Sequence, residues 1–181
     1  ATETIDAFVL AGSVAVAGGS VVGLAGSGAG VNVVNKIGHE VKASIDGDSR
    51  VSDNSRAGIT ATSISLLASD SSSITAEAGA VSVAVSIGLV GASIAVGVAT
   101  ATNEMNNAVL AQIDNAADVR TTVGDVTLTA EEIGSITSNT YSSAAAAAIS
   151  AFGLAAAAGI TTGENIHNGD VEESINDAIV S

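Results

Sequence analysis

Residues 103–115, which read NEMNNAVLAQIDN, decide the fold of this chain because the same pattern occurs three times. Residues 35–47 read NKIGHEVKASIDG, and residues 165–177 read NIHNGDVEESIND. Each copy begins with Asn, has Val six residues later and Ile ten residues later, and ends with Gly, Asn or Asp. The copies begin 68 and then 62 residues apart. A repeat of this length indicates a solenoid, in which successive coils stack on one another.

The similarity continues upstream of the three copies. A glycine lies twelve residues before the first Asn of each copy, at Gly23, Gly91 and Gly153. We therefore interpret the chain as one segment of a repeat array. Its parts are the tail of a preceding repeat, two whole repeats and a truncated repeat, at residues 1–12, 13–81, 82–142 and 143–181.

Downstream of the copies the similarity is weaker but still visible. GITAT at 58–62 resembles GDVTLT at 124–129, and SIT at 73–75 recurs at 135–137. This alignment places the difference between the two periods within residues 63–72. An insertion there would lie in a surface turn, where insertions are tolerated best.

Alternating hydrophobicity predicts the secondary structure of each repeat. VLAQI at 109–113 and VKASI at 41–45 place an apolar residue at every second position, which is the period of a strand with one buried face. The alternating valines of residues 14–16 and 81–87 continue the pattern, and Val, Ile and Thr suit a pleated sheet. Each strand of the frame ends at a residue type that tolerates a left-handed backbone. We predict structural turns at Gly47, Asn115 and Asp177.

The composition limits what can fill the core of such a solenoid. Aromatic residues are 2% of the chain, with no Trp and no Pro, whereas 47% of the residues are hydrophobic. Small inward-facing residues such as Ala, Val and Gly would let the walls of a coil approach closely. With about 20 to 23 residues per coil, each repeat would form about three coils. The sequence therefore predicts an all-β fold, a parallel β-solenoid (β-helix) built from repeats of about 62–68 residues.

The alanine-rich residues 144–148 and 155–158 leave one local choice open. Alanine is the strongest helix former, so these residues taken alone favour a helix. Their alignment with the Val- and Ile-rich residues 81–98 favours strands instead. Gly153 and Gly159 would also interrupt a helix.

The charge balance excludes some classes of partner. Five Lys and Arg face 19 Asp and Glu, which gives a net charge of -14, so we expect no nucleic-acid binding. The charges are absent from residues 7–35, 78–103 and 133–163. Each stretch is long enough to cross a bilayer as a helix, but all are rich in Ser, Thr and Gly and have acidic flanks. We interpret them as the interior of the solenoid and expect no membrane insertion.

Few residues qualify for a chemical site. Asp46, Asp48 and Asp53 crowd one turn and are a candidate Ca²⁺ site. Only Asp46 has an acidic equivalent in the next copy, so the alternative is a set of solvated turn acids. The chain has no Cys, and His39 and His167 occupy different positions of the repeat, so we expect both at the surface. No motif of a catalytic triad is present. We predict no catalytic residue and no cofactor other than Ca²⁺ at this candidate site.

The repeat resembles a known family. The frame Asn-x5-Val-x-Ala-x-Ile-Asp, the strand GDVTLTA at 124–130 and the Gly-, Ala- and Val-rich block that follows are similar to the long repeats of leukotoxin-family filamentous adhesins and other giant repetitive bacterial surface proteins. The resemblance implies a parallel β-solenoid stalk of a very large secreted or surface-anchored protein. It carries no catalytic residues.

We therefore expect a non-catalytic structural or adhesive segment, located outside the cell or on a bacterial cell surface. Its expected partners are further copies of itself, end to end or side by side in fibres, and the surface of a host or neighbouring cell. Two alternatives stay open. One is a carbohydrate-active β-helix enzyme, for which only Tyr141 could serve as an aromatic sugar platform. The other is a membrane-inserting toxin segment.

Overall fold

The computed structural model describes residues 1–47, 59–116, 119–176 and 180, and all the regular structure in them is β-strand. This confirms the predicted all-β fold and places the alanine-rich residues 144–148 and 155–158 in strands. The strands are β1 (Thr4–Gly18), β2 (Val22–Asp46), β3 (Ile59–Ala61), β4 (Ile64–Ile87), β5 (Val90–Asp114), β6 (Val119–Thr121), β7 (Val126–Ile149) and β8 (Phe152–Asn176).

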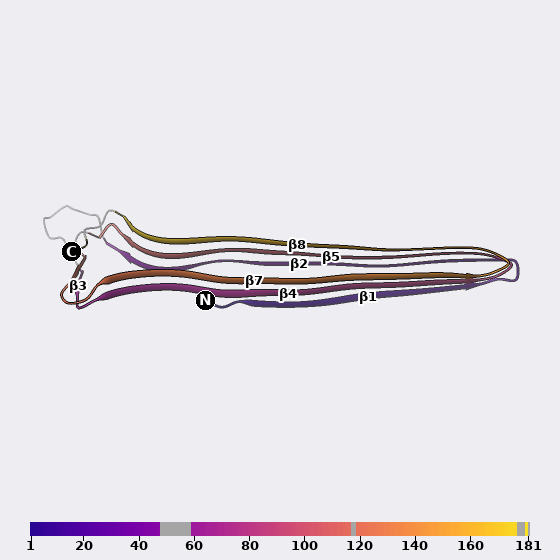
Figure 1. The fold of residues 1–181 in the computed structure, drawn as a ribbon, viewed down its shortest axis with the longest axis horizontal. Helices are drawn as coiled ribbons and strands as arrows, with labels where there is room; N and C mark the ends of the chain where they lie inside the picture. Colours follow the sequence, from indigo (N-terminus) through magenta and orange to yellow (C-terminus); the bar gives the residue numbers. More distant parts are fainter. Residues whose placement is uncertain (48–58, 117–118, 177–179, 181) are drawn as a thin grey trace.

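The six long strands form two parallel sheets. Their strand orders are β1-β4-β7 and β2-β5-β8, and β3 pairs with β6 in a small third sheet. The chain runs along one sheet, turns, and returns along the other, so the two sheets face each other over their full length (Figure 1). The result is a flattened parallel β-solenoid.

Each repeat forms one coil of two long strands, so the expectation of three coils per repeat was wrong. The strands are 24 or 25 residues long in the complete coils, β4 with β5 and β7 with β8. The glycines within them have no positive φ, and among the described non-glycine residues only Asn115 does. A glycine interrupts a strand only where its backbone turns. The backbone is extended at these glycines, so they do not divide the long strands into shorter coils.

The register of the sheets follows the repeat for most of its length. Asn35, Asn103 and Asn165 are partners across β2, β5 and β8, as are Gly23, Gly91 and Gly153. SIT at 73–75 pairs with SIT at 135–137. These parts of the predicted alignment are confirmed.

The predicted alignment of residues 58–62 with 124–129 was wrong. Ile59 pairs with Val119, and Ile64 pairs with Val126. The longer first period therefore comes from the segment between Asp46 and Ile59 and not from residues 63–72. In the next repeat the corresponding segment, between Asp114 and Val119, is shorter. Short Thr-containing runs are too similar to one another to fix a register alone.

The long dimension of the molecule lies along the strands. A strand of 25 residues, such as β5, spans about 80 Å at roughly 3.3 Å per residue. Neighbouring coils are only about 4.8 Å apart along the solenoid axis. Each repeat of 62–68 residues is therefore one wide, thin layer.

The half of the molecule that carries the charges, which we call the charged half, has the expected core. Val109, Ala111 and Ile113 are fully buried and pack against Ile64 and Leu66 of the opposite sheet. A second cluster joins Ile37, Ile74 and Met105. Here the branched side chains point inward, as their alternation predicts.

The other half reverses this pattern. We call residues 7–31, 78–99 and 141–161 the uncharged half, because they contain no Asp, Glu, Lys or Arg. Its interior consists mainly of alanines, including Ala25, Ala84 and Ala95, whereas Val14 and Val16 are exposed on the outer face. The expectation that these valines and the uncharged stretches as a whole are buried was wrong, since only alternate residues point inward.

The close approach of the two sheets explains the reversal. A Cβ atom at Gly97 would lie 3.1 Å from the backbone oxygen of Ser143 and 3.3 Å from that of Ala80, which are on the opposite sheet. Only Gly, Ala and Ser side chains fit between walls this close. The valines therefore face outward.

The turns that join the two sheets at the end of the uncharged half are bonded from coil to coil. Gly19 N donates to Ile87 O (3.0 Å), Val90 N to Val21 O (2.8 Å) and Phe152 N to Leu89 O (3.1 Å). The stacking of coils thus continues through the turns. The described residues include no helix that is long and apolar enough to cross a membrane.

Candidate functional site

The predicted calcium turn is only partly within the described residues. Asp46 ends β2 and is the register partner of Asp114. Asn115 adopts a φ of 51°, and its Nδ2 donates to Asp46 Oδ1 at 3.4 Å. Gly47 N donates to Asp114 O at 2.9 Å, and a Cβ atom on Gly47 would lie 2.4 Å from the backbone oxygen of Asn115. Only glycine permits this close approach between coils.

The remaining members of that prediction lie outside the described residues. They are Asp48, Asp53 and Asp177. Within the described part of the chain, no three His, Asp or Glu side chains come together as a group that could hold a metal ion. The Ca²⁺ site stays a prediction.

A buried polar cluster that the sequence did not predict lies between the sheets and is centred on Asp70. The Asp70 side chain is fully buried. His39 Nε2 lies 2.8 Å from Asp70 Oδ1, Ser72 Oγ donates to the same oxygen at 3.0 Å, and Asn107 Nδ2 donates to Oδ2 at 2.7 Å. Glu3 Oε2 lies 3.9 Å from the other ring nitrogen of His39.

These hydrogen bonds determine the charge state of Asp70. Burial raises the pKa of this carboxyl, but the hydrogen bonds from His39, Ser72 and Asn107, together with the charge of His39, hold the pKa below its ordinary value. Asp70 is therefore an ionised carboxylate inside the coil at neutral pH. A buried carboxylate is tolerated because its two oxygens accept three hydrogen bonds.

The surface position expected for His39 was wrong. Its side chain is only 16% exposed because residue 39 shares the inward face of β2 with Val41, Ala43 and Ile45. His39 and Ser72 both contact the carboxylate of Asp70. In a catalytic triad the imidazole contacts the serine hydroxyl, so this arrangement is suited to holding the two sheets together rather than to nucleophilic chemistry.

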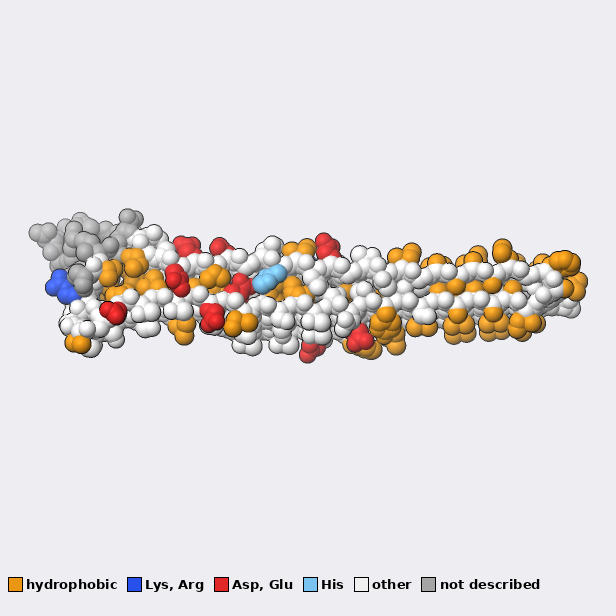
Figure 2. All heavy atoms as spheres, in the orientation of Figure 1, with side chains coloured by type: hydrophobic (Ala, Val, Ile, Leu, Met, Phe, Trp, Pro, Cys, Tyr) orange, Lys and Arg blue, Asp and Glu red, His pale blue; other side chains and the backbone are white. Residues whose placement is uncertain are grey.

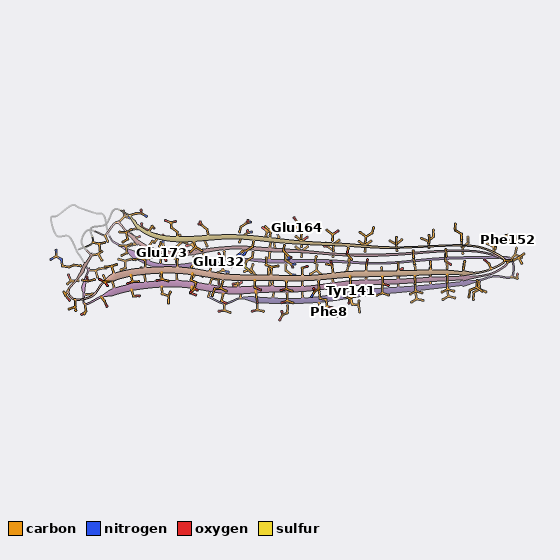
Figure 3. The ribbon with its side chains drawn as sticks, viewed as in Figure 1. Phe8, Glu132, Tyr141, Phe152, Glu164 and Glu173 are labelled. Atoms are coloured by element: carbon orange, nitrogen blue, oxygen red, sulfur yellow. The ribbon has the colours of Figure 1, made fainter. Side chains whose placement is uncertain are left out.

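A second acid–histidine pair lies one coil further along the axis. Glu132 is the register partner of Asp70, and His167 Nε2 lies 2.9 Å from Glu132 Oε1. The carboxylate is buried, but His167 is exposed because no described strand pairs with the outer edge of β8. Figure 3 shows Glu132 and Glu173 in the charged half of the molecule. The pair joins the two sheets as Asp70 and His39 do, although the register equivalent of His39 on β8 is Gly169 and not His167.

An asparagine ladder runs through the coils beside these pairs. Asn35 Nδ2 donates to Asn103 Oδ1 at 2.8 Å, and Asn103 Nδ2 donates to Asn165 Oδ1 at 2.9 Å. Asn103 is fully buried. Every amide in the ladder donates in the same direction along the axis, and a shift of one residue in the register would break each bond.

Among the described residues, both sheets end in strands that pair on one side only. β1 and β2 are the edge strands at one end, and β7 and β8 at the other. The inward-facing residues of β8 are exposed, although those of its partner β5 are buried: Ala157 is exposed and its partner Ala95 is fully buried. An exposed strand of this length presents a row of backbone donors and acceptors to which another strand can pair.

One shallow hollow on the outer face is lined by Asp6, Ala7, Phe8, Thr75 and Glu77, with a volume of about 200 Å³. It lies on β1 and β4 where the charged and uncharged halves meet. We assign it no chemistry.

Comparison with known proteins gives no relative for this chain: no family model, no curated protein and no solved structure matches it.

Proposed function

We propose that this segment is a non-catalytic structural module that stacks coil upon coil with further copies of itself. Following the resemblance of its repeats, we place it in a large bacterial surface protein outside the cell. The observation that carries the proposal is the pair of open edges, where β8 exposes an inward face that β5 buries. A further coil on this edge would pair its backbone and cover its alanines.

The asparagine ladder supports the same association. Asn165 holds the last position of the ladder at the β8 edge, and Asn35 holds the first position at the β2 edge. An incoming coil that places its own Asn35 over Asn165 would extend the ladder in the same direction. The ladder would thus select one register among the many that a long alternating strand permits.

The acidic residues favour stacks that do not associate side by side with neighbouring stacks. The net charge is -14, and the carboxylates lie in the charged half of the molecule (Figure 2). Repulsion between such surfaces limits side-by-side contacts in that half. Adhesion to a host or neighbouring cell would use this displayed surface.

A matched pair of substitutions on β8 tests the proposal. Ala157 points toward the inner face and Ala156 toward the outer face, and both are exposed. Lysine at 157 would be buried beneath an added coil, whereas lysine at 156 would stay in solvent. We expect the unmodified segment and Ala156→Lys to form elongated assemblies by electron microscopy, and Ala157→Lys to remain as single segments.

Circular dichroism serves as the folding control, because neither alanine is buried in the single segment and both variants should keep the β spectrum. Assemblies formed equally by Ala157→Lys would contradict axial stacking. A sedimentation profile of monodisperse monomers for the unmodified segment would do so as well.

A further inference from the structure

The uncharged half carries large apolar side chains on both of its outer faces. Figure 2 shows them above and below the layers at the turn end of the molecule, away from the acidic side chains. We call this surface the apolar band. It consists of Leu10, Val14, Val16, Val81 and Ile87 on the β1-β4-β7 sheet, and Leu24, Val90, Ile94, Phe152, Leu154 and Ile160 on the β2-β5-β8 sheet.

The height of the band matches the interior of a lipid bilayer. From Val90 to Ile94 and on to residue 98, or from Phe152 to Ile160, the outward apolar side chains extend over about 26 Å at roughly 3.3 Å per residue. The shortest distance from a charge to the turn runs from Glu77 to Ile87, which is about 33 Å on the same scale. The hydrocarbon core of a bilayer is about 30 Å thick.

Aromatic residues lie at the two borders of the band. Phe152 lies at the turn end, and Phe8 and Tyr141 lie near the middle of the molecule where the charges begin (Figure 3). The ring of Tyr141 covers Gly79 on the next strand, since a Cβ atom there would lie 2.3 Å from its Cζ. Aromatic side chains prefer these interfacial depths in membrane-spanning sheets.

Many polar groups of the uncharged half are bonded internally, although the buried hydroxyl of Ser150 has no hydrogen-bond partner. The turn backbones are bonded from coil to coil, as described above. Between the sheets, Ser13 Oγ lies 2.6 Å from Ser27 Oγ, and Ser93 Oγ donates to Ser86 Oγ at 2.8 Å. Large apolar side chains outside and small side chains, mainly Ala with some Ser, inside reverse the pattern of a water-soluble sheet and suit a hydrocarbon solvent.

We infer that the uncharged half lies in the hydrocarbon core of a lipid bilayer while the charged half stays in water. A second copy packed face to face would cover one outer face only, whereas the band covers both faces and continues around the turns. The inference rests on the proposed stacking, because open edges of β1, β2, β7 and β8 are unfavourable in lipid until further coils pair them. The prediction of no membrane insertion was made for these stretches as helices. In strands, by contrast, the large apolar residues lie mainly on the outer face.

Flotation with vesicles tests the inference. Assemblies first verified by electron microscopy would be mixed with phosphatidylcholine vesicles, which are chosen because anionic lipid would repel a chain of net charge -14. The test variant is Ile94→Glu, in the middle of the band, and the control is Leu67→Glu in the charged half. The two positions are on the central strands of their sheets and are similarly exposed, 58% and 64%. We expect the unmodified protein and Leu67→Glu to float, and Ile94→Glu to bind at least about tenfold less.

A fluorescent reporter measures the depth of insertion. The chain has no Trp, so Phe152→Trp introduces a single reporter at the turn end and Leu67→Trp a matched one in the charged half. With vesicles of bromine-labelled phosphatidylcholine, we expect quenching of Trp at 152 and none at 67.

The outcomes separate the two proposals. Absence of assemblies by electron microscopy without lipid would overturn the stacking and this inference with it. Verified assemblies that do not float would overturn the inference alone. Emission from Trp at 152 that is blue-shifted without vesicles, together with face-to-face pairing in the images, would assign the band to a second copy instead of lipid.

Discussion

At the scale of single residues, the polar groups inside the charged half determine how the two sheets meet. Asp70 reaches across from β4 to His39 on β2 and Asn107 on β5. Contacts between alanines and valines are similar in several registers of the two sheets. A carboxylate that accepts three hydrogen bonds keeps all of them in one register only. Asn103 does the same along the axis. These residues give a core of small side chains a unique register.

The first prediction concerns Asp70. Asp70→Ala would leave the donors of His39 and Asn107 buried without an acceptor, and we expect the free energy of unfolding at pH 7 to fall by about 2–4 kcal/mol. Ser71→Ala, at the exposed outer neighbour, is the control and should change it by less than about 0.5 kcal/mol. Urea denaturation followed by circular dichroism measures both.

The pH dependence of this difference follows from the lowered pKa of Asp70 in the folded state. The contribution is complete above the unfolded pKa of about 3.9 and is lost as the pH falls through the lower folded pKa. The gap in unfolding free energy between the unmodified protein and Asp70→Ala should therefore narrow as the pH falls below about 4. A gap that widens in this acid range would contradict the assignment.

At the scale of the strand, one element carries two opposite patterns. Along β4, the inward positions hold Ile64 and Leu66 in the charged half and Ala84 in the uncharged half. The same alternate positions face inward in both halves. What changes is the space between the sheets, which admits branched side chains at one end and only small ones at the other.

A pair of substitutions in the uncharged half tests this reversal. Ala84 is fully buried, so Ala84→Leu should overpack the interior and lower the free energy of unfolding by about 1–3 kcal/mol. Val14 is 73% exposed, so Val14→Ala should change it by less than about 0.5 kcal/mol. Thermal or urea unfolding of both variants shows which substitution lowers the free energy of unfolding more. A larger loss for Val14→Ala than for Ala84→Leu would mean that the valines point inward.

The sequence predicted the strands and most of the register but not the inside and outside of the uncharged half. Alternation in residues 81–87 shows that a strand has two faces, and hydrophobicity alone assigns the valines to the core. The distance between the sheets decides otherwise, and that distance depends on the facing strand. The predicted number of coils per repeat was wrong for a related reason. The sequence suggests turns at glycines whose backbone is in fact extended within the strands.

The Asp70 cluster was partly within reach of the sequence. Asp70 shares its parity with Ile64, Leu66 and Ala68, so alternation already places it inside. Its partner His39 is 31 residues away on the other sheet. Finding that contact requires the width of the coil, which the repeat period gives only once each repeat is known to form a single coil.

At the scale of the whole molecule, the elongated shape belongs to the coil and not to the stack. Three coils occupy only about 14 Å of the axis at roughly 4.8 Å each, while each coil is about 80 Å wide at 3.3 Å per residue. The proposed assembly of many copies would therefore be a flat ribbon with the strands running across it. One long margin of the ribbon would be apolar, and the other would be acidic.

Mass per length distinguishes this ribbon from a narrow rod. One segment of 17.3 kDa per about 14 Å of axis gives roughly 12 kDa per nanometre, as measured by scanning transmission electron microscopy. Three coils per repeat would give about a third of that value, since the same mass would extend over three times the length. A value near 4 kDa per nanometre would contradict the single-coil repeat.

The identity of one repeat with one coil also has a genetic consequence. Recombination between two copies of the repeat in the coding DNA would delete or add a whole number of coils, and the strands on either side would meet the same partners as before. The differing periods, 68 and 62 residues, already leave the pairing of the long strands in register. A gene that holds such repeats could therefore gain or lose coils without any compensating change in the residues that remain.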